Sequence, residues 1–206
     1  MAKLPRPPAD LAGVPPEWRA VPSGTALFRV YFRASRHPTT WNTFRFFGPV
    51  NARFDHHEEP PRAQDRGILY PATHPRAALA EAFQAGRLID ARTDEPWLVG
   101  FRLTETVRLL DLLGLWPTRA GASTAINSGP RPTVRRWARV IYTSYPEAQG
   151  IWYGSSMAAN TPCVALFERA RAAVPTAPAF HRALADATIE AFLVRTAAEL
   201  GYRLAL

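Results

Sequence analysis

The distribution of apolar residues along the chain predicts short strands separated by turns. Residues 26–32 are mostly β-branched or aromatic, and Arg29 interrupts an otherwise apolar run. Further short apolar runs lie between turn residues. The segments expected to be strands are 26–32, 67–70, 97–103, 151–153, 163–167 and 203–206.

Three segments have the spacing and the end signals of helices. We expect these helices at 75–86, 133–145 and 179–200. Pro75 suits a first helical turn and Thr133 suits a helix cap. Gly86 and Gly201 are suited to the positions at which helices end.

The remaining segments are expected to lack regular structure. Residues 1–25 are rich in proline and predict an irregular N-terminal arm. Broken extended structure is expected at 44–54, and loops at 35–43, 56–65 and 111–132. Because strands and helices follow one another without regular βαβ order, the predicted fold class is α+β, in one compact domain over 26–206.

Composition adds limits on the class of protein. A hydrophobic fraction of 47% and a charged fraction of 20% are typical of a soluble globular domain. Cys163 is the one cysteine, which excludes an internal disulfide and a thiolate metal cluster within one chain. No signal peptide and no apolar run of about 20 residues stands out, so we expect a cytoplasmic protein without a membrane partner.

The net charge of +8 comes almost entirely from arginine, because Lys3 is the one lysine. Codon usage in a GC-rich genome explains such a bias, and so does the binding of anions, since arginine holds phosphate or carboxylate bidentately. The arginines are spread along the chain without a basic tail or a nucleic-acid-binding motif. This favours a small phosphorylated ligand or an acidic protein over direct binding of nucleic acid.

Several familiar sites are missing from the sequence. There is no GxGxxG after a strand, no phosphate-binding P-loop and no HExxH. The run 56–59, which reads His-His-Glu-Glu, is interpreted as a solvated polar loop, because neighbouring loop residues rarely point the same way. No metal site is predicted.

Arg29 and Glu81 are the first candidates for chemistry. A charge inside an apolar strand must find a partner or face a cavity, so Arg29 lies in a site, in an ion pair or on a wet edge. Glu81 lies opposite Leu79 and Phe83 on the expected helix, among alanines that leave room for a ligand. A solvated glutamate on an outer face is the competing interpretation, and the local pattern alone favours the structural roles.

Tyr70, Ser155 and Ser156 are further candidates. Tyr70 ends a strand just before a helix, where ligand contacts are common, although a core tyrosine has the same pattern. The two serines lie in a turn between strands, where serine is frequent for local reasons. No histidine is positioned to activate either hydroxyl as a nucleophile.

Taken in order, these residues resemble the motifs of the RES domain, a family of bacterial toxins named for Arg, Glu and Ser. Segment 27–30 is similar to the opening L-[FY]-R-[VI] motif, and 51–54 is similar to G-[AG]-R-[FW], with Asn51 at the usual glycine. Segments 67–70 and 77–81 resemble the Y-x-A … A-L-x-E block, and 152–156 resembles the late Y-x-S motif. The spacing from Tyr153 favours Ser155 over Ser156 as the motif serine.

The resemblance implies a fold and an activity. It implies a pair of mixed, short-stranded sheets flanked by helices, as in ADP-ribosyltransferases. It further implies cleavage of the nicotinamide–ribose bond of NAD by water or inorganic phosphate, with NAD as a consumed substrate, no resident cofactor, and an Xre-type antitoxin as protein partner.

The resemblance also implies roles for the candidate residues. Glu81 would stabilise positive charge on the ribose, as in glycoside cleavage. Arg29 and Arg53 would bind the diphosphate, Tyr70 would stack on nicotinamide, and Ser155, with Ser156 beside it, would hydrogen-bond the substrate.

Three alternatives remain open at this point. The same site could transfer ADP-ribose to a protein. The chain could instead be a basic binding module without catalysis, or a RES protein that has lost its activity.

Overall fold

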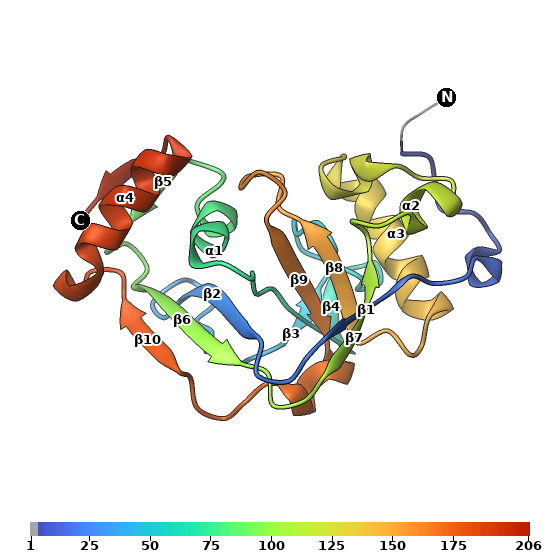
Figure 1. The fold of residues 1–206 in the computed structure, drawn as a ribbon, viewed down its shortest axis with the longest axis horizontal. Helices are drawn as coiled ribbons and strands as arrows, with labels where there is room; N and C mark the ends of the chain where they lie inside the picture. The colour runs from blue at the N-terminus through green and yellow to red at the C-terminus, as the bar shows by residue number, and fades with distance from the viewer. Residues whose placement is uncertain (1–3) are drawn as a thin grey trace.

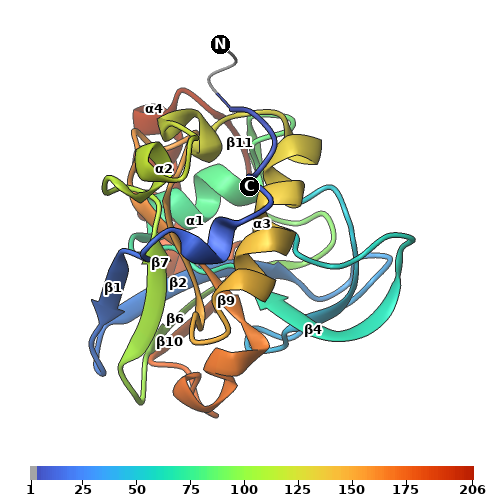
Figure 2. The same cartoon turned by 90° about the vertical axis from the view of Figure 1, so that its right-hand side faces the viewer.

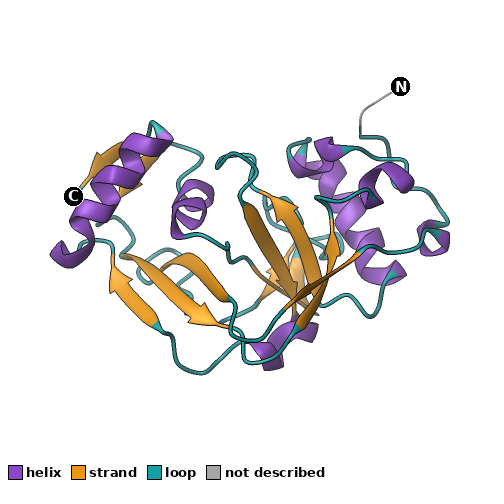
Figure 3. Cartoon of the chain, in the orientation of Figure 1, coloured by secondary structure: helices purple, strands orange, loops and turns teal. Residues whose placement is uncertain are grey.

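The computed structural model describes residues 4–206, which form an α+β fold with three sheets (Figures 1 and 3). The six-stranded sheet has the order β1-β7-β8-β9-β4-β3, the three-stranded sheet has the order β10-β6-β2, and β11 pairs with β5. The pairs β7–β8 and β5–β11 are parallel and the other pairs are antiparallel. The predicted α+β class, with short-stranded sheets flanked by helices in one compact domain, is confirmed. Of the two larger sheets, the six-stranded one is mixed and the three-stranded one is antiparallel.

The strands are short, as predicted. They are β1 (Trp18–Val21), β2 (Ala26–Phe32), β3 (Arg45–Gly48), β4 (Arg62–Leu69), β5 (Leu88–Asp90), β6 (Pro96–Arg102), β7 (Val107–Asp111), β8 (Gly150–Gly154), β9 (Pro162–Phe167), β10 (Phe180–Ala183) and β11 (Arg203–Ala205). The α-helices are α1 (Pro75–Ala82), α2 (Trp116–Arg119), α3 (Arg131–Ser144) and α4 (Glu190–Leu200), and 3₁₀ turns lie at Leu11–Gly13, Thr124–Asn127, Glu168–Ala173 and Ala187–Ile189.

Ala72 joins the two larger sheets. It forms isolated bridges to Phe28 on β2 and to Cys163 on β9. The Phe28 and Ala72 backbones exchange two hydrogen bonds of 2.7 Å, and Val164 donates to the carbonyl of Pro71 at 2.9 Å. The segment between β4 and α1 therefore connects the sheets, and α1 lies above this junction in Figure 1.

Helix α1 is fixed on the junction by its apolar face. Ala77, Leu79 and Ala80 are fully buried. The ring nitrogen of His74 caps the first turn by accepting from the backbone of Arg76, and Pro75 occupies the first turn as predicted. The helix ends at Ala82, before Gly86, so the predicted C-terminal boundary is too late.

The part of the predicted arm that the structure describes, residues 4–25, is less irregular than predicted, and residues 1–3 of that prediction lie outside the described residues. Trp18–Val21 forms β1, which pairs antiparallel with β7 at the edge of the six-stranded sheet (Figure 2). Leu11 is fully buried, and the carbonyls of Leu11 and Val14 each lie 2.9 Å from the hydroxyl of Tyr145, which directly follows α3. Residues 4–25 are therefore folded onto the domain, because β1 finds a partner far along the chain.

The helix predicted at 179–200 is wrong in its first half and correct in its second. Phe180–Ala183 forms β10, which pairs with β6, and Asp186 then caps a 3₁₀ turn by accepting from Thr188. The helix α4 runs from Glu190 to Leu200, and the φ of 64° at the following Gly201 agrees with the predicted stop. Pairing with the edge of β6 overrides the local helical preference.

Two further boundaries differ from the prediction. The helix α3 begins at Arg131, with Pro130 rather than Thr133 at the cap, because Pro132 fits the first turn of a helix. The segment 111–132, predicted as loop, contains α2 and a 3₁₀ turn, and β1, β5 and β7 were not predicted.

The run 56–59 is solvated only in its second half, because Glu58 and Glu59 are exposed whereas His56 and His57 are fully buried. The ring of His56 stacks on Tyr142 of α3 at 4.4 Å and contacts Phe167 at 4.5 Å. Aromatic packing against distant elements therefore buries these residues. Within residues 4–206, no group of three or more His, Cys, Asp or Glu side chains could hold a metal ion, and no helix is long and apolar enough to cross a membrane.

Candidate active site

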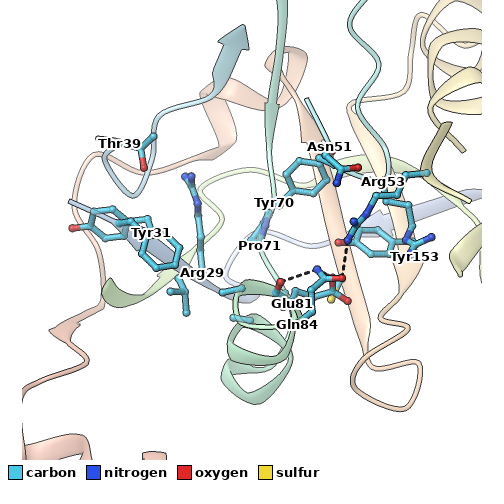
Figure 4. Close-up of a pocket in the computed structure, with 18 residues that line it drawn as sticks. Arg29, Tyr31, Thr39, Asn51, Arg53, Tyr70, Pro71, Glu81, Gln84 and Tyr153 are labelled. Atoms are coloured by element: carbon cyan, nitrogen blue, oxygen red, sulfur yellow. Dashed lines mark hydrogen bonds between the residues drawn. The ribbon is translucent and has the colours of Figure 1, made fainter. Parts of the chain in front are cut away.

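A pocket of about 360 Å³ opens where β2, the 51–53 segment, α1 and the start of α3 meet. Its volume is in the range of small-molecule sites. Figure 4 shows Arg29 and Tyr31 on one side and Arg53 and Tyr153 on the other. Glu81 of α1 lies between them, with Gln84 just after that helix. The structure thus brings four predicted residues to one pocket, namely Arg29, Arg53, Tyr70 and Glu81.

The Glu81 carboxylate is held by uncharged donors. Its Oε1 accepts from the Ser155 hydroxyl at 2.5 Å, and its Oε2 accepts from the Gln84 amide at 3.3 Å. Ala78 and Ala82 of the same helix line the pocket, in agreement with the expectation of small neighbours. The carboxylate therefore forms hydrogen bonds with neutral side chains and faces space that a ligand can enter.

Ser155 lies behind Glu81 and is fully buried. Its hydroxyl donates to Glu81 and accepts from the backbone amides of Met157 at 3.2 Å and Ala158 at 3.1 Å. A serine hydroxyl has one hydrogen and two lone pairs, so its capacity is fully used. This differs from the expected direct contact with substrate and points to a role in positioning Glu81.

Ser156 is exposed and does not line the pocket. Of the two adjacent serines, Ser155 is the one that contacts Glu81, as the spacing from Tyr153 indicated. The expected contact of Ser156 with substrate has no counterpart in the pocket.

Arg29 points from β2 into the pocket. Its Nη1 donates to the carbonyl of Trp41 at 2.8 Å, and the carbonyls of Thr40 and Thr43 lie at 3.4 Å. Burial lowers the pKa of Arg29 to about 10, and the nearby charge of Arg45 acts in the same direction while Tyr31 opposes it. The guanidinium therefore remains cationic at neutral pH.

Arg53 and Arg131 supply two more cations on the opposite wall. Arg53 donates to the carbonyl of Gly129 at 2.6 Å, and Arg131 donates to the Gln84 side chain at 3.0 Å. Burial lowers the pKa of Arg53, while the charge of Glu81 raises it and that of Arg131 lowers it.

None of the three pocket arginines forms an ion pair with any carboxylate in the described part of the chain. Three cations and one carboxylate leave the pocket with an excess of positive charge. A buried cation without a counterion is costly, so this arrangement suits an anionic ligand.

Aromatic side chains complete the lining. Burial raises the pKa of Tyr70 far above its usual value, and its buried hydroxyl makes no ordinary hydrogen bond, although the Phe54 backbone is close enough to oppose the shift slightly. Burial likewise raises the pKa of Tyr153, and that of Cys163 to about 12, with the Glu81 charge adding to both. All three groups stay neutral, so Cys163 is not a thiolate nucleophile.

A buried ion network holds the loop that carries Arg53. Asp55 accepts from Arg45 at 2.9 Å, from the backbone of Val50 at 2.6 Å and from the His57 ring at 2.5 Å. Burial alone would raise the pKa of Asp55, but these three partners lower it to about 2. The loop is therefore fixed against the pocket wall by a residue with no access to the ligand.

Among the pocket residues that the sequence did not indicate are Gln84, Arg131 and Tyr153. Gln84 follows Glu81 by three positions, a spacing that brings helical side chains together and could have identified it. Arg131 reaches the pocket through the packing of α3, and no local signal in the sequence indicates this.

The comparisons with known proteins agree with the geometry. The RES domain model matches residues 26–189. A chain of the crystal structure of the M. tuberculosis MbcT–MbcA toxin–antitoxin complex has the same fold, with a TM-score of 0.52 and 12% identity. That match covers 79% of this chain and 85% of the other. No curated protein matches the sequence significantly.

Proposed function

The chain belongs to the RES-domain family, and from this premise we propose that it is a toxin that cleaves the nicotinamide–ribose bond of NAD. One observation carries the proposal. The Glu81 carboxylate, held by Ser155 and Gln84, faces a pocket whose three arginines have no carboxylate partners. NAD provides both an anionic diphosphate and a glycosidic bond that needs a carboxylate.

The charge of the substrate fits the charge of the pocket. Arg29 and Arg53 can bind the diphosphate bidentately, as guanidinium groups do with phosphate oxygens. Tyr70 and Tyr153 are neutral and flat, and either ring can stack on a planar base and exclude water. NAD is then bound as a substrate that is consumed rather than as a resident cofactor.

The chemical step follows from the position of Glu81. As the bond between ribose C1′ and the nicotinamide nitrogen breaks, its electron pair leaves with nicotinamide and the ribose gains positive charge. The carboxylate stabilises that charge, as in glycoside cleavage. Water or inorganic phosphate then attacks C1′, and its proton passes to Glu81 or to solvent.

Ser155 acts through Glu81 in this scheme. Its hydroxyl fixes one carboxylate oxygen, and two backbone amides fix the hydroxyl. The carboxylate therefore does not have to reorganise when charge develops on the ribose, which is the main source of electrostatic catalysis.

The biological setting is part of the proposal. The structural neighbour is a toxin–antitoxin complex, and a protein that depletes NAD must be restrained in its own cell. We expect an Xre-type antitoxin protein as the partner and the cytoplasm as the place of action. Expression without the partner should stop growth, and expression of Glu81→Gln should be tolerated.

The test is release of free nicotinamide from NAD by the purified protein, with and without phosphate, beside Glu81→Gln. The proposal predicts release by wild type and almost none by the variant. A dependence on phosphate would identify a phosphorylase, and release without phosphate a hydrolase. If nicotinamide is released but ADP-ribose appears on protein by intact-mass analysis, the acceptor is a side chain. No release in any buffer would contradict the proposal.

A further inference from the structure

Gln84 follows Glu81 by three positions and lies just beyond the end of α1 at Ala82, and both side chains line the pocket. Both the nitrogen and the oxygen of the Gln84 side-chain amide form hydrogen bonds. Its nitrogen donates to the Glu81 backbone carbonyl at 2.8 Å and to the Glu81 carboxylate at 3.3 Å. Its oxygen accepts from Arg131 at 3.0 Å. The amide thus stands between a cation and a carboxylate that would otherwise attract each other.

The neighbourhood of Glu81 makes this arrangement consequential. Arg53 lies close enough to Glu81 for the carboxylate charge to raise the pKa of Arg53. Arg131 also lies close to Arg53, and its positive charge lowers the pKa of Arg53. Neither guanidinium forms an ion pair with Glu81 within residues 4–206. Arg53 is directed to the carbonyl of Gly129, and Arg131 is directed to Gln84.

A direct pair between Arg131 and Glu81 would disable the site. A bidentate guanidinium would occupy both carboxylate oxygens and neutralise the charge that the ribose needs. It would also consume a cation that the anionic substrate needs. An uncharged amide in between avoids both losses, because it donates to the carboxylate without supplying a full positive charge.

We propose that Gln84 is a positioning residue that orients the Glu81 carboxylate and keeps Arg131 one hydrogen bond away from it. The consequence for the reaction rests on the proposed function, because it concerns the carboxylate that stabilises the ribose. Gln84 works with Ser155: the hydroxyl fixes one carboxylate oxygen and the amide fixes the other.

The kinetic test compares Gln84→Ala with wild type in nicotinamide release. Loss of the amide frees Arg131 and one oxygen of Glu81. We expect kcat to fall about 10- to 100-fold, the usual cost of a hydrogen bond to a charged group, and to fall by more than KM rises. A residue that only stabilised the fold would reduce the amount of active enzyme, which single-turnover active-site counting would reveal. Unchanged kcat in folded Gln84→Ala overturns the proposal.

A second variant tests the geometry without relying on activity. Gln84→Glu keeps an acceptor for Arg131 but puts a carboxylate beside Glu81, and like charges disfavour the ionised form. ¹³C NMR of the side-chain carboxyls, assigned with Glu81→Gln, should show Glu81 titrating at higher pH in Gln84→Glu than in wild type. The other groups around Glu81 are common to both proteins: Arg53, Arg131, Tyr153, Cys163 and Tyr202.

The two experiments separate the inference from the proposed function. If wild type releases no nicotinamide, the proposed function fails, and the NMR titration still decides whether Gln84 holds Glu81. If wild type releases nicotinamide but the Glu81 titration is the same in both proteins, the inference is overturned and the proposed function stands. A shifted titration together with reduced kcat in Gln84→Ala supports both.

Discussion

Two glutamates in this molecule have opposite surroundings, and the difference separates structure from function. Glu168, after β9, accepts from the Tyr142 hydroxyl at 2.6 Å and the Gly67 amide at 2.8 Å, with His56 and Arg169 each at 3.8 Å. Glu81 accepts from two uncharged side chains and faces the pocket. One carboxylate is saturated by protein, and the other is left able to act on a ligand.

The arginines divide in the same way. Arg45 pairs with the buried carboxylate of Asp55, and Arg66 pairs with Glu58 and lies over the Tyr142 ring at 4.7 Å. Arg29, by contrast, contacts backbone carbonyls of the 40–43 segment. An arginine paired with a carboxylate of the protein stabilises the fold, whereas an arginine without a carboxylate partner is available to bind an anionic ligand.

The largest expected effect is a double dissociation between the two glutamates. Glu81→Gln should lower the rate of nicotinamide release about 10²- to 10³-fold, as loss of an electrostatic stabiliser does, while NAD affinity changes little. Glu168→Gln should leave the rate within a few fold and lower the free energy of unfolding. Single-turnover kinetics, calorimetric NAD titration and urea unfolding measure the three quantities. Equal rates of nicotinamide release by the two variants would contradict a catalytic role for Glu81 that Glu168 lacks.

Arg29→Ala should have the next largest effect, now on binding. Loss of a charged partner for phosphate costs about 1.5–3 kcal/mol, so the Kd for NAD should rise about 10- to 100-fold. The matched control is Arg108→Ala, since Arg108 forms an exposed ion pair with Glu147 at 3.7 Å. Comparable losses in both variants would indicate a general effect of positive charge rather than a specific site.

The adjacent serines offer a sharper comparison. Ser155→Ala removes the donor to Glu81 and should lower kcat about tenfold, the cost of about one hydrogen bond, with a smaller change in KM. Ser156→Ala alters an exposed side chain and should leave kcat within about twofold of wild type. Steady-state kinetics on both variants decide this, and the reverse ranking would contradict the assignment of Ser155.

Glu168 should also contribute to stability in a pH-dependent manner. Burial would raise its pKa, but contacts with His56, Tyr142 and the Gly67 amide lower it from 4.5 to about 2. A lowered folded-state pKa contributes stability above pH 4.5, and that contribution is lost as pH falls towards 2. The contribution at neutral pH is on the order of 1–2 kcal/mol, reduced by solvent around the partly exposed side chain.

Urea unfolding at pH 7 and pH 3 measures this contribution. Glu168→Gln should lose less stability between these pH values than wild type, since it lacks the titrating group. An identical pH dependence in both proteins would show that Glu168 is not the saturated carboxylate described above.

The smallest expected effect concerns Cys163. Burial raises its pKa to about 12, so the thiol is neutral and unreactive at pH 7. Iodoacetamide should leave nicotinamide release unchanged and should label the cysteine in urea alone, which mass spectrometry can follow. Labelling of the native protein with loss of activity would mean that the thiol takes part in the site.

Local signals in the sequence drew attention to part of this site. Arg29 inside an apolar strand and Glu81 on an alanine-rich helical face stood out from their neighbours, but these signals alone favoured structural roles. The ordered resemblance to the RES motifs made both residues site candidates, and the structure brings both to one pocket. Arg131 could not be found in this way, because it reaches the pocket only through the packing of α3. The three-residue spacing between Glu81 and Gln84 was a local signal that could have identified Gln84 as a neighbour of Glu81.

The errors in the fold have the same origin. Segments 18–21 and 180–183 become strands because the edges of β7 and β6 are available to pair with them. His56 is buried because Tyr142 and Phe167, from distant elements, pack against its ring. Partners that lie far along the chain decide these features, whereas periodicity decides those that were predicted correctly.

A crystal structure of Glu81→Gln with NAD would show directly whether Glu81 acts on the ribose of NAD. We expect intact NAD in the pocket, with its diphosphate on the guanidinium groups of Arg29 and Arg53 and the nicotinamide ribose against residue 81. NAD bound elsewhere, or bound with the ribose turned away from residue 81, would show that this pocket is not the site of NAD cleavage.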